Sequence, residues 1–272
     1  FWDGEDPDFA ARVASLLVDR RIALIPNLVA YDQIIAEIEN LDRLLAEKNW
    51  NQVTPLARIY SQVPYNGYVE DFAGADIRDR ALAHFRKQHA MMFEIVREVK
   101  RRGGILVAGS DAGNPTMYPG DGLHRELELR VAAGLSTDDA LIAATRSAAA
   151  VLGEENRRGR LAPGFEAELV LLDRDPTVDI RATRTVSALY SKGMFVARED
   201  LEDLGNRLAM SAPFTAGESS SLGRISRISA FAWPSVSTSA SSATVITCRE
   251  IEAAGLQSPA VDPILGSGGS IS

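Results

Sequence analysis

The sequence predicts an α/β fold followed by a smaller β unit and a Ser-rich tail. Apolar residues recur with helical spacing in several segments, and short apolar runs of strand length separate these segments. After Gly153 the helical spacing gives way to strand-like runs joined by turns. Helices that alternate with short buried strands are typical of βα units around a parallel sheet.

The first part of the chain predicts a helix, a strand and a second helix. Residues 8–20 carry apolar side chains at amphipathic spacing, residues 22–25 form a β-prone run that Pro26 ends, and residues 31–48 return to helical spacing. Residues 49–75 are rich in Asn, Pro, Gly and Tyr and show no period. They predict a long irregular segment, either a lid or substrate loop or, more commonly for such segments, a simple surface excursion.

The next segments repeat the pattern. Residues 76–102 predict one long helix, which the glycine pair at 103–104 ends before a buried strand at 105–108 and a turn-rich exit at 109–115. Residues 122–133 predict a helix with Gly134 at its C-terminal cap. Ser136 opens a capping-box pattern for a further helix that runs to Leu152.

The β unit is predicted from three strand-like runs. Residues 167–172 form the first, and residues 186–190 and 194–197 form a hairpin around Lys192 and Gly193. From residue 211 the composition changes, because 15 of the remaining residues are Ser, which predicts a mostly disordered tail. We therefore expect three regions, namely an α/β region at 1–153, a β unit at 154–208 and a low-complexity tail at 209–272.

Composition excludes several classes of protein. The 272 residues are 46% apolar and 24% charged, which is ordinary for a globular chain, and the net charge of −8 disfavours nucleic acid as a partner. Cys248 is the single cysteine, so an internal disulfide and a cysteine-rich metal cluster are excluded. No run of about 18 to 20 apolar residues predicts a membrane span, and the acidic first residues do not resemble a signal peptide. We expect a soluble protein without membrane partners, with the cytoplasm favoured.

Asp111 is the strongest candidate for chemistry from its position alone. It follows the predicted strand at 105–108, and the carboxyl ends of strands are where active sites form in α/β barrels. A carboxylate there can bind a metal and take a proton from metal-bound water. The structural alternative is a turn or cap residue, which is the commoner role of Asp beside Gly.

Several segments in order resemble the amidohydrolase superfamily, most closely its imidazolonepropionase and Xaa-Pro dipeptidase-like branch. The motif residues lie at 104–113, 123–129, 133–136, 143–149, 152–153, 159–173 and 191–194. The upstream strand that ends at Ile25-Pro26-Asn27-Leu28 agrees with this branch. One departure is Glu168, where relatives commonly have Asp.

The resemblance implies the last strands and helices of a TIM-type (β/α)8 barrel followed by part of a small β-sandwich. It implies a metal-dependent hydrolase of amide or other carbon–nitrogen bonds, with one or two divalent ions, zinc being expected, and a peptide-like or cyclic amide substrate. Asp111 matches the final-strand aspartate that binds metal and transfers the proton from water to the leaving nitrogen. From its position near the start of the helix after Asp111, His124 is a candidate substrate contact at the mouth of the site, with a solvated or hydrogen-bonded histidine as the commoner alternative.

The sequence also departs from the family, because the His-x-His pair, the bridging Lys or Glu and the later His ligands are absent. Of the three histidines, His84 and His89 lie five residues apart on one helix, about 140° around its axis, so they are read as surface or packing residues. We therefore expect the C-terminal part of an enzyme that is inactive in isolation, with a non-enzymatic remnant or interaction protein as the alternative. A phosphate-binding loop at 109–113 is disfavoured, because the required Lys and full glycine spacing are missing.

Overall fold

The computed structural model describes residues 6–47, 55, 74–112, 116–117, 120–210 and 244–247. The predicted irregular segment at 49–75 therefore lies outside the described residues, apart from positions 55, 74 and 75. Among the described helices, none is both long and apolar enough to cross a membrane.

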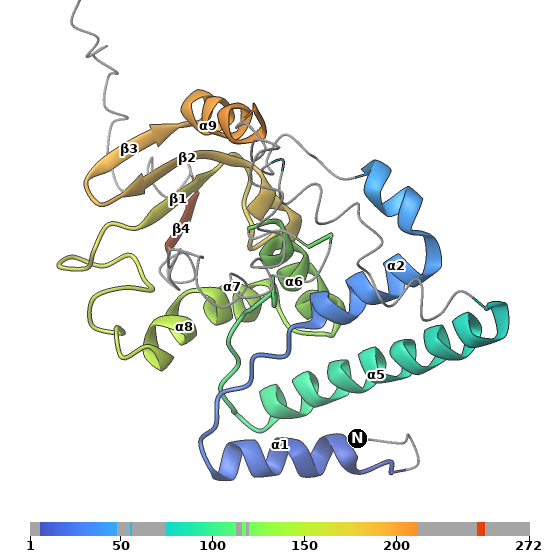
Figure 1. The fold of residues 1–272 in the computed structure, drawn as a ribbon. Coiled ribbons are helices and arrows are strands. Elements are labelled where there is room, and N and C mark those ends of the chain that lie inside the picture. Colours follow the sequence, from blue (N-terminus) through green and yellow to red (C-terminus); the bar gives the residue numbers. More distant parts are fainter. Residues whose placement is uncertain are drawn as a thin grey trace, which may run out of the picture.

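Three helices form the N-terminal part of the fold. Helices α1 (Phe9–Asp19), α2 (Leu28–Glu47) and α5 (Ala75–Arg101) confirm the three helices predicted there. Figure 1 shows α1 and α5 side by side, with α2 on the other side of α5. Their apolar faces bury Ala14, Leu28, Val96 and Val99, which join residues of the next helix in one core cluster.

Helix α2 is interrupted at Asn40, whose backbone is extended (φ −165°, ψ 88°). The Asn40 side chain accepts a hydrogen bond from the Arg43 backbone N–H at 2.9 Å and so caps the second half of the helix. Across the break, the Arg78 side chain on α5 donates to the carbonyl oxygens of Ile38, at 2.9 Å, and of Glu39. The carbonyl groups that the break releases are thus satisfied by a neighbouring helix.

The two predicted parallel strands are present only as short extended segments. Leu24 and Leu106 form a single parallel bridge, in which the Leu24 N–H donates to Ile105 O at 2.9 Å and the Val107 N–H to Leu24 O at 3.0 Å. The prediction of full strands at 22–25 and 105–108 is therefore wrong, since the structure has only this bridge. No further strand flanks the pair among the described residues, so the ladder is not extended. Three apolar side chains of the two segments, Ile22, Ile25 and Ile105, are exposed.

Helix α6 (Asp121–Ala132) follows as predicted, and Gly134 takes the left-handed conformation (φ +98°) just after it. Ser136 caps the next helix by accepting a hydrogen bond from the Asp139 N–H at 3.1 Å. The single helix predicted up to Leu152 is instead two helices, α7 (Thr137–Ala144) and α8 (Arg146–Val151). The break at Thr145 leaves Ala143 O free to accept from the Ala108 N–H at 3.0 Å, which ties α7 to the second extended segment.

The C-terminal part is a four-stranded sheet of order β3-β2-β1-β4. Strands β1 (Leu169–Leu172), β2 (Val186–Ser191) and β3 (Met194–Ala197) pair antiparallel, which confirms the predicted hairpin. Lys192 and Gly193 turn it with φ +51° and +79°, as a type I′ turn requires. Strand β4 (Thr244–Thr247) pairs parallel with β1. The rest of the predicted tail, 211–243 and 248–272, lies outside the described residues.

Three elements of this part were not predicted. Strand β4 is one of them, since it falls in the segment 209–272 that was expected to be a mostly disordered tail. A 3-10 helix, η2 (Ile180–Arg184), precedes β2, and helix α9 (Arg198–Met210) lies beside β2 and β3 (Figure 1). The described residues combine helices with one small sheet, so the fold is mixed α/β. Neither a closed barrel nor a second sheet packed as a sandwich is present in the described part of the chain.

Candidate active site

The candidate site lies where the two extended segments end. Because the segments are parallel, their carboxyl ends reach the same edge, and their exit loops are neighbours. A Cβ on Gly109 would lie 2.5 Å from Ile25 Cγ2 and 2.9 Å from Asn27 Oδ1. Only glycine fits this close approach without a movement of the neighbouring atoms. Gly109 therefore sets the distance between the exit loops of the two segments, called the two exits below.

Asp111 lies at this edge and is exposed. Its backbone is in the left-handed region (φ +54°), as is that of Asn27 on the neighbouring exit (φ +48°), and Asp and Asn are the side-chain-bearing residues that tolerate this region best. The Asp111 carboxylate makes no hydrogen bond or ion pair with the described residues, so it is available to a ligand. Asn27 Oδ1 is buried without a partner in that same part of the chain.

A buried ion pair holds the two exits in place. Glu126 and Arg130 lie one turn apart on α6 with their side chains fully buried, and Arg130 Nε donates to Glu126 Oε1 at 3.0 Å. Glu126 Oε2 accepts from the Val29 N–H at 3.0 Å, at the start of α2, while Arg130 Nη2 donates to Val107 O at 2.5 Å. Burial raises the pKa of the Glu126 carboxyl, and the Arg130 charge and the Val29 N–H oppose this rise. One helix thus positions both exits.

A second buried contact anchors the chain beyond Asp111. Thr116 is fully buried with φ +63°, which is unusual for a β-branched residue. Its hydroxyl accepts from Gln33 Nε2 at 2.6 Å and donates to the Glu37 carboxylate, and both partners are buried on α2. No local pattern predicted this contact, because Thr116 lies far from Gln33 and Glu37 in the chain. The Glu126–Arg130 pair spans one helical turn, but its burial depends on the elements that pack against α6 and was not predicted either.

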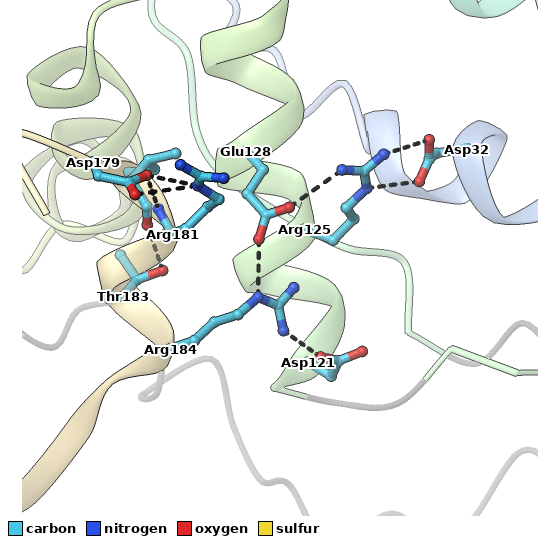
Figure 2. Close-up of polar contacts among 9 residues, drawn as sticks. Asp32, Asp121, Arg125, Glu128, Asp179, Arg181, Thr183 and Arg184 are labelled. Carbon is cyan, nitrogen blue, oxygen red and sulfur yellow. Dashed lines mark hydrogen bonds and ion pairs between the residues drawn. The ribbon is translucent and has the colours of Figure 1, made fainter. Parts of the chain in front are cut away.

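A chain of ion pairs runs over the opposite, solvent-facing side of α6 (Figure 2). Arg125 binds the Asp32 carboxylate through two hydrogen bonds of 2.8 and 3.0 Å, and it contacts Glu128 at 3.2 Å. Glu128 in turn accepts from Arg184 Nε at 2.9 Å, and Arg184 Nη1 donates to Asp121 at 2.6 Å. The chain links α2, α6 and η2.

The three histidines lie apart. His84 on α5 is exposed and meets the Phe85 ring edge-on, with ring centroids 5.7 Å apart. His89 packs between Tyr31 and Phe93, at centroid distances of 6.4 and 4.7 Å. His124 Nδ1 contacts Thr183 Oγ1 at 3.0 Å on η2. Both α5 histidines are thus surface or packing residues, as expected.

Residues 12–197 match the model of the amidohydrolase family. The chain belongs to this family. The matched region runs from α1 through β3 and ends just before α9. No curated protein and no solved structure matches the chain.

Amidohydrolases hydrolyse carbon–nitrogen bonds and generally use metal ions. The donors in the described part of this amidohydrolase do not fit a metal, because no group of three or more His, Cys, Asp or Glu side chains that could hold an ion occurs there. Among the described residues no second ligand accompanies Asp111, and His124 Nδ1 is engaged by Thr183.

Proposed function

We propose that this amidohydrolase chain contributes Asp111 to the hydrolysis of an amide or other carbon–nitrogen bond. A single observation carries the proposal, namely an exposed carboxylate that is not engaged by any described residue, at the shared edge of the two parallel segments and inside the region that matches the family. The substrate we propose is a small peptide-like or cyclic amide.

In this proposal Asp111 transfers a proton. Its carboxylate accepts a proton from the attacking water as the water oxygen forms its bond to the amide carbon. The same proton then passes from Asp111 to the leaving nitrogen as the carbon–nitrogen bond breaks, so the carboxylate is regenerated. The exposed position of Asp111 and the buried supports of its loop favour this role, because the group must be both reachable and well positioned.

We propose further that the remaining site residues, including the ligands of a divalent metal such as zinc, come from a second polypeptide. The exposed apolar side chains of Ile22, Ile25 and Ile105 support this, because exposed apolar surface favours association with another polypeptide. The same apolar surface also favours the second candidate, a non-enzymatic interaction protein. The predicted contact between His124 and the substrate is not part of this proposal.

The test is complementation. The purified chain is assayed alone and together with a polypeptide that carries the His-x-His half of a family barrel, on N-acyl amino acids, dipeptides and lactams with added zinc. We expect neither turnover nor stoichiometric zinc binding with the chain alone, and we expect turnover with the mixture. Asp111→Asn should lower kcat/KM by at least about 100-fold. The matched control Asp138→Asn, at an exposed acid in the first turn of α7, should not change it.

Turnover by Asp111→Asn at the original rate would remove Asp111 from the mechanism. If the chain binds its partner polypeptide without any turnover, the interaction protein is the better account. Tight zinc binding and turnover by the chain alone would overturn the proposal that the ligands come from elsewhere.

A further inference from the structure

A cavity of about 1000 Å³ lies between the N-terminal turn of α6, the end of η2 with the start of β2, and α9. It is separate from the edge that carries Asp111. A Cβ on Gly122 would lie 3.1 Å from Ser110 Cβ, so this side of α6 packs against the Asp111 loop. His124, which lines the cavity, is two residues further along and hence about 200° around the helix axis. The cavity therefore opens on the other side of α6.

The hydrogen bonds around His124 fix its tautomer. The Thr183 hydroxyl donates its proton to Ile180 O at 2.9 Å, so Thr183 Oγ1 can only accept from the imidazole. His124 Nδ1 therefore carries a hydrogen and donates it to Thr183 over 3.0 Å. Burial, helped by the Arg184 charge, lowers the pKa of His124 and favours the neutral ring. Nε2 thus keeps a lone pair, and no described residue donates to it.

Two guanidinium groups in the cavity have N–H donors that no described residue uses. Arg184 uses Nε for Glu128 and Nη1 for Asp121, and Arg198 uses Nη2 for Asp173. Each guanidinium carries five N–H donors, so several remain on both residues, and their fork matches a carboxylate.

The other lining residues complement these groups. Asp121, Asp173 and Glu202 place negative charge around the cavity, while Val186, Leu189 and Leu201 supply apolar surface. A ligand that satisfies the whole lining carries a carboxylate, an N–H donor with positive charge and a short apolar group.

We propose that this cavity binds a small apolar α-amino acid, with its carboxylate on Arg184 and Arg198, its ammonium N–H donating to His124 Nε2, and its side chain against Leu189 and Leu201. This proposal does not depend on hydrolysis at Asp111, since the two sites lie on opposite sides of α6.

The test is titration of the full chain with L-leucine by calorimetry, together with ¹⁵N NMR of the imidazole. The two fragments acetate and isobutylamine, each carrying one of the charged groups, are titrated for comparison. We expect saturable leucine binding that shifts the His124 Nε2 resonance, and weaker binding of both fragments. Before leucine is added, the spectrum should show the hydrogen on Nδ1.

The decisive variant is His124→Asn. The Asn amide nitrogen takes the place of Nδ1 and can still donate to Thr183, but no atom remains at the Nε2 position. We expect leucine binding about tenfold weaker, as for one lost hydrogen bond, and an unchanged unfolding transition. Arg198→Gln should weaken leucine and acetate alike, while Asp111→Asn should leave leucine binding unchanged.

Three results would each overturn the proposal. These are the absence of saturable leucine binding, equal affinity in a folded His124→Asn variant, and a hydrogen on Nε2 in the free protein. Because the readout is binding and not turnover, failure here is distinguishable from failure of the proposed hydrolase function.

Discussion

The two sides of α6 carry the same kinds of charged residue in opposite surroundings. On one side the Glu126–Arg130 pair is fully buried, and on the other the chain from Asp32 through Arg125, Glu128 and Arg184 to Asp121 is partly exposed. Both link α6 to other elements. Water screens the exposed charges and solvates them when a partner is lost, whereas a buried charge that loses its partner has no substitute. The two sides should therefore respond very differently to single substitutions.

The largest effect is expected on the buried side. Arg130→Met leaves Glu126 buried without its cation and removes the donor to Val107 O. We expect a loss of about 3–5 kcal/mol in the free energy of unfolding, measured by urea denaturation. The double variant Glu126→Gln with Arg130→Met should be more stable than Arg130→Met alone, because the amide is neutral and can still accept from the Val29 N–H. A double variant that is less stable would show that charge burial is not the cause.

The next effect concerns the close approach of the two exits. Gly109→Ala would place Cβ 2.5 Å from Ile25 Cγ2, a stiff β-branched group, so the exits must move apart. We expect a loss of about 1–3 kcal/mol in unfolding free energy.

Ile25→Ala provides the matched test of this clash. It removes Cγ2 at a half-exposed position and should cost little by itself, yet it should restore part of the stability that Gly109→Ala loses, since the contact of the added Cβ with Asn27 Oδ1 remains. Additive losses in the double variant would show that Ile25 is not the obstacle.

Local patterns were enough to predict much of this fold. Helices α1, α2, α5 and α6 and the β2–β3 hairpin follow from apolar spacing, caps and a turn dipeptide, all of which act over a few residues. Helix α9 was missed although Leu201, Leu204 and Leu208 have helical spacing and Glu199 and Asp200 occupy its first turn. Its interior Gly205 and the preceding strands concealed that signal.

The site was less predictable than the fold. Asp111 was predicted because a carboxylate after an apolar run of strand length is a local signal, and its catalytic role stays a prediction. The Glu126–Arg130 pair and the Thr116 contacts with Gln33 and Glu37 depend on which helices pack together, and a single sequence does not carry that information. Glu126 and Arg130 are both buried, although charged side chains are rarely buried unless they are paired.

A smaller effect is expected on the exposed side of α6. Asp32→Asn removes the carboxylate that binds Arg125 through two hydrogen bonds, but both side chains are partly exposed (29% and 43%). We expect a loss of about 0.2–1 kcal/mol that shrinks as salt is added. A loss as large as that of Arg130→Met, or one that salt does not reduce, would contradict the contrast between the two sides.

The smallest effect is a dependence of stability on pH. Burial lowers the pKa of His89 below 6.5, with Asp32 opposing and Arg125 adding to the shift, and burial likewise lowers the pKa of His124. At a pH between its folded and unfolded pKa values, each histidine binds more protons in the unfolded chain than in the folded one. Its contribution to the free energy of unfolding is therefore present above pH 6.5 and is lost as the pH falls.

Replacing His89 by Phe suits its aromatic neighbours Tyr31 and Phe93 and should flatten the fall in unfolding free energy from pH about 7 to about 5. His84→Gln, at an exposed position on the same helix, is the control and should keep the slope of the original chain. An unchanged slope in His89→Phe would mean that protonation of this ring is not coupled to unfolding.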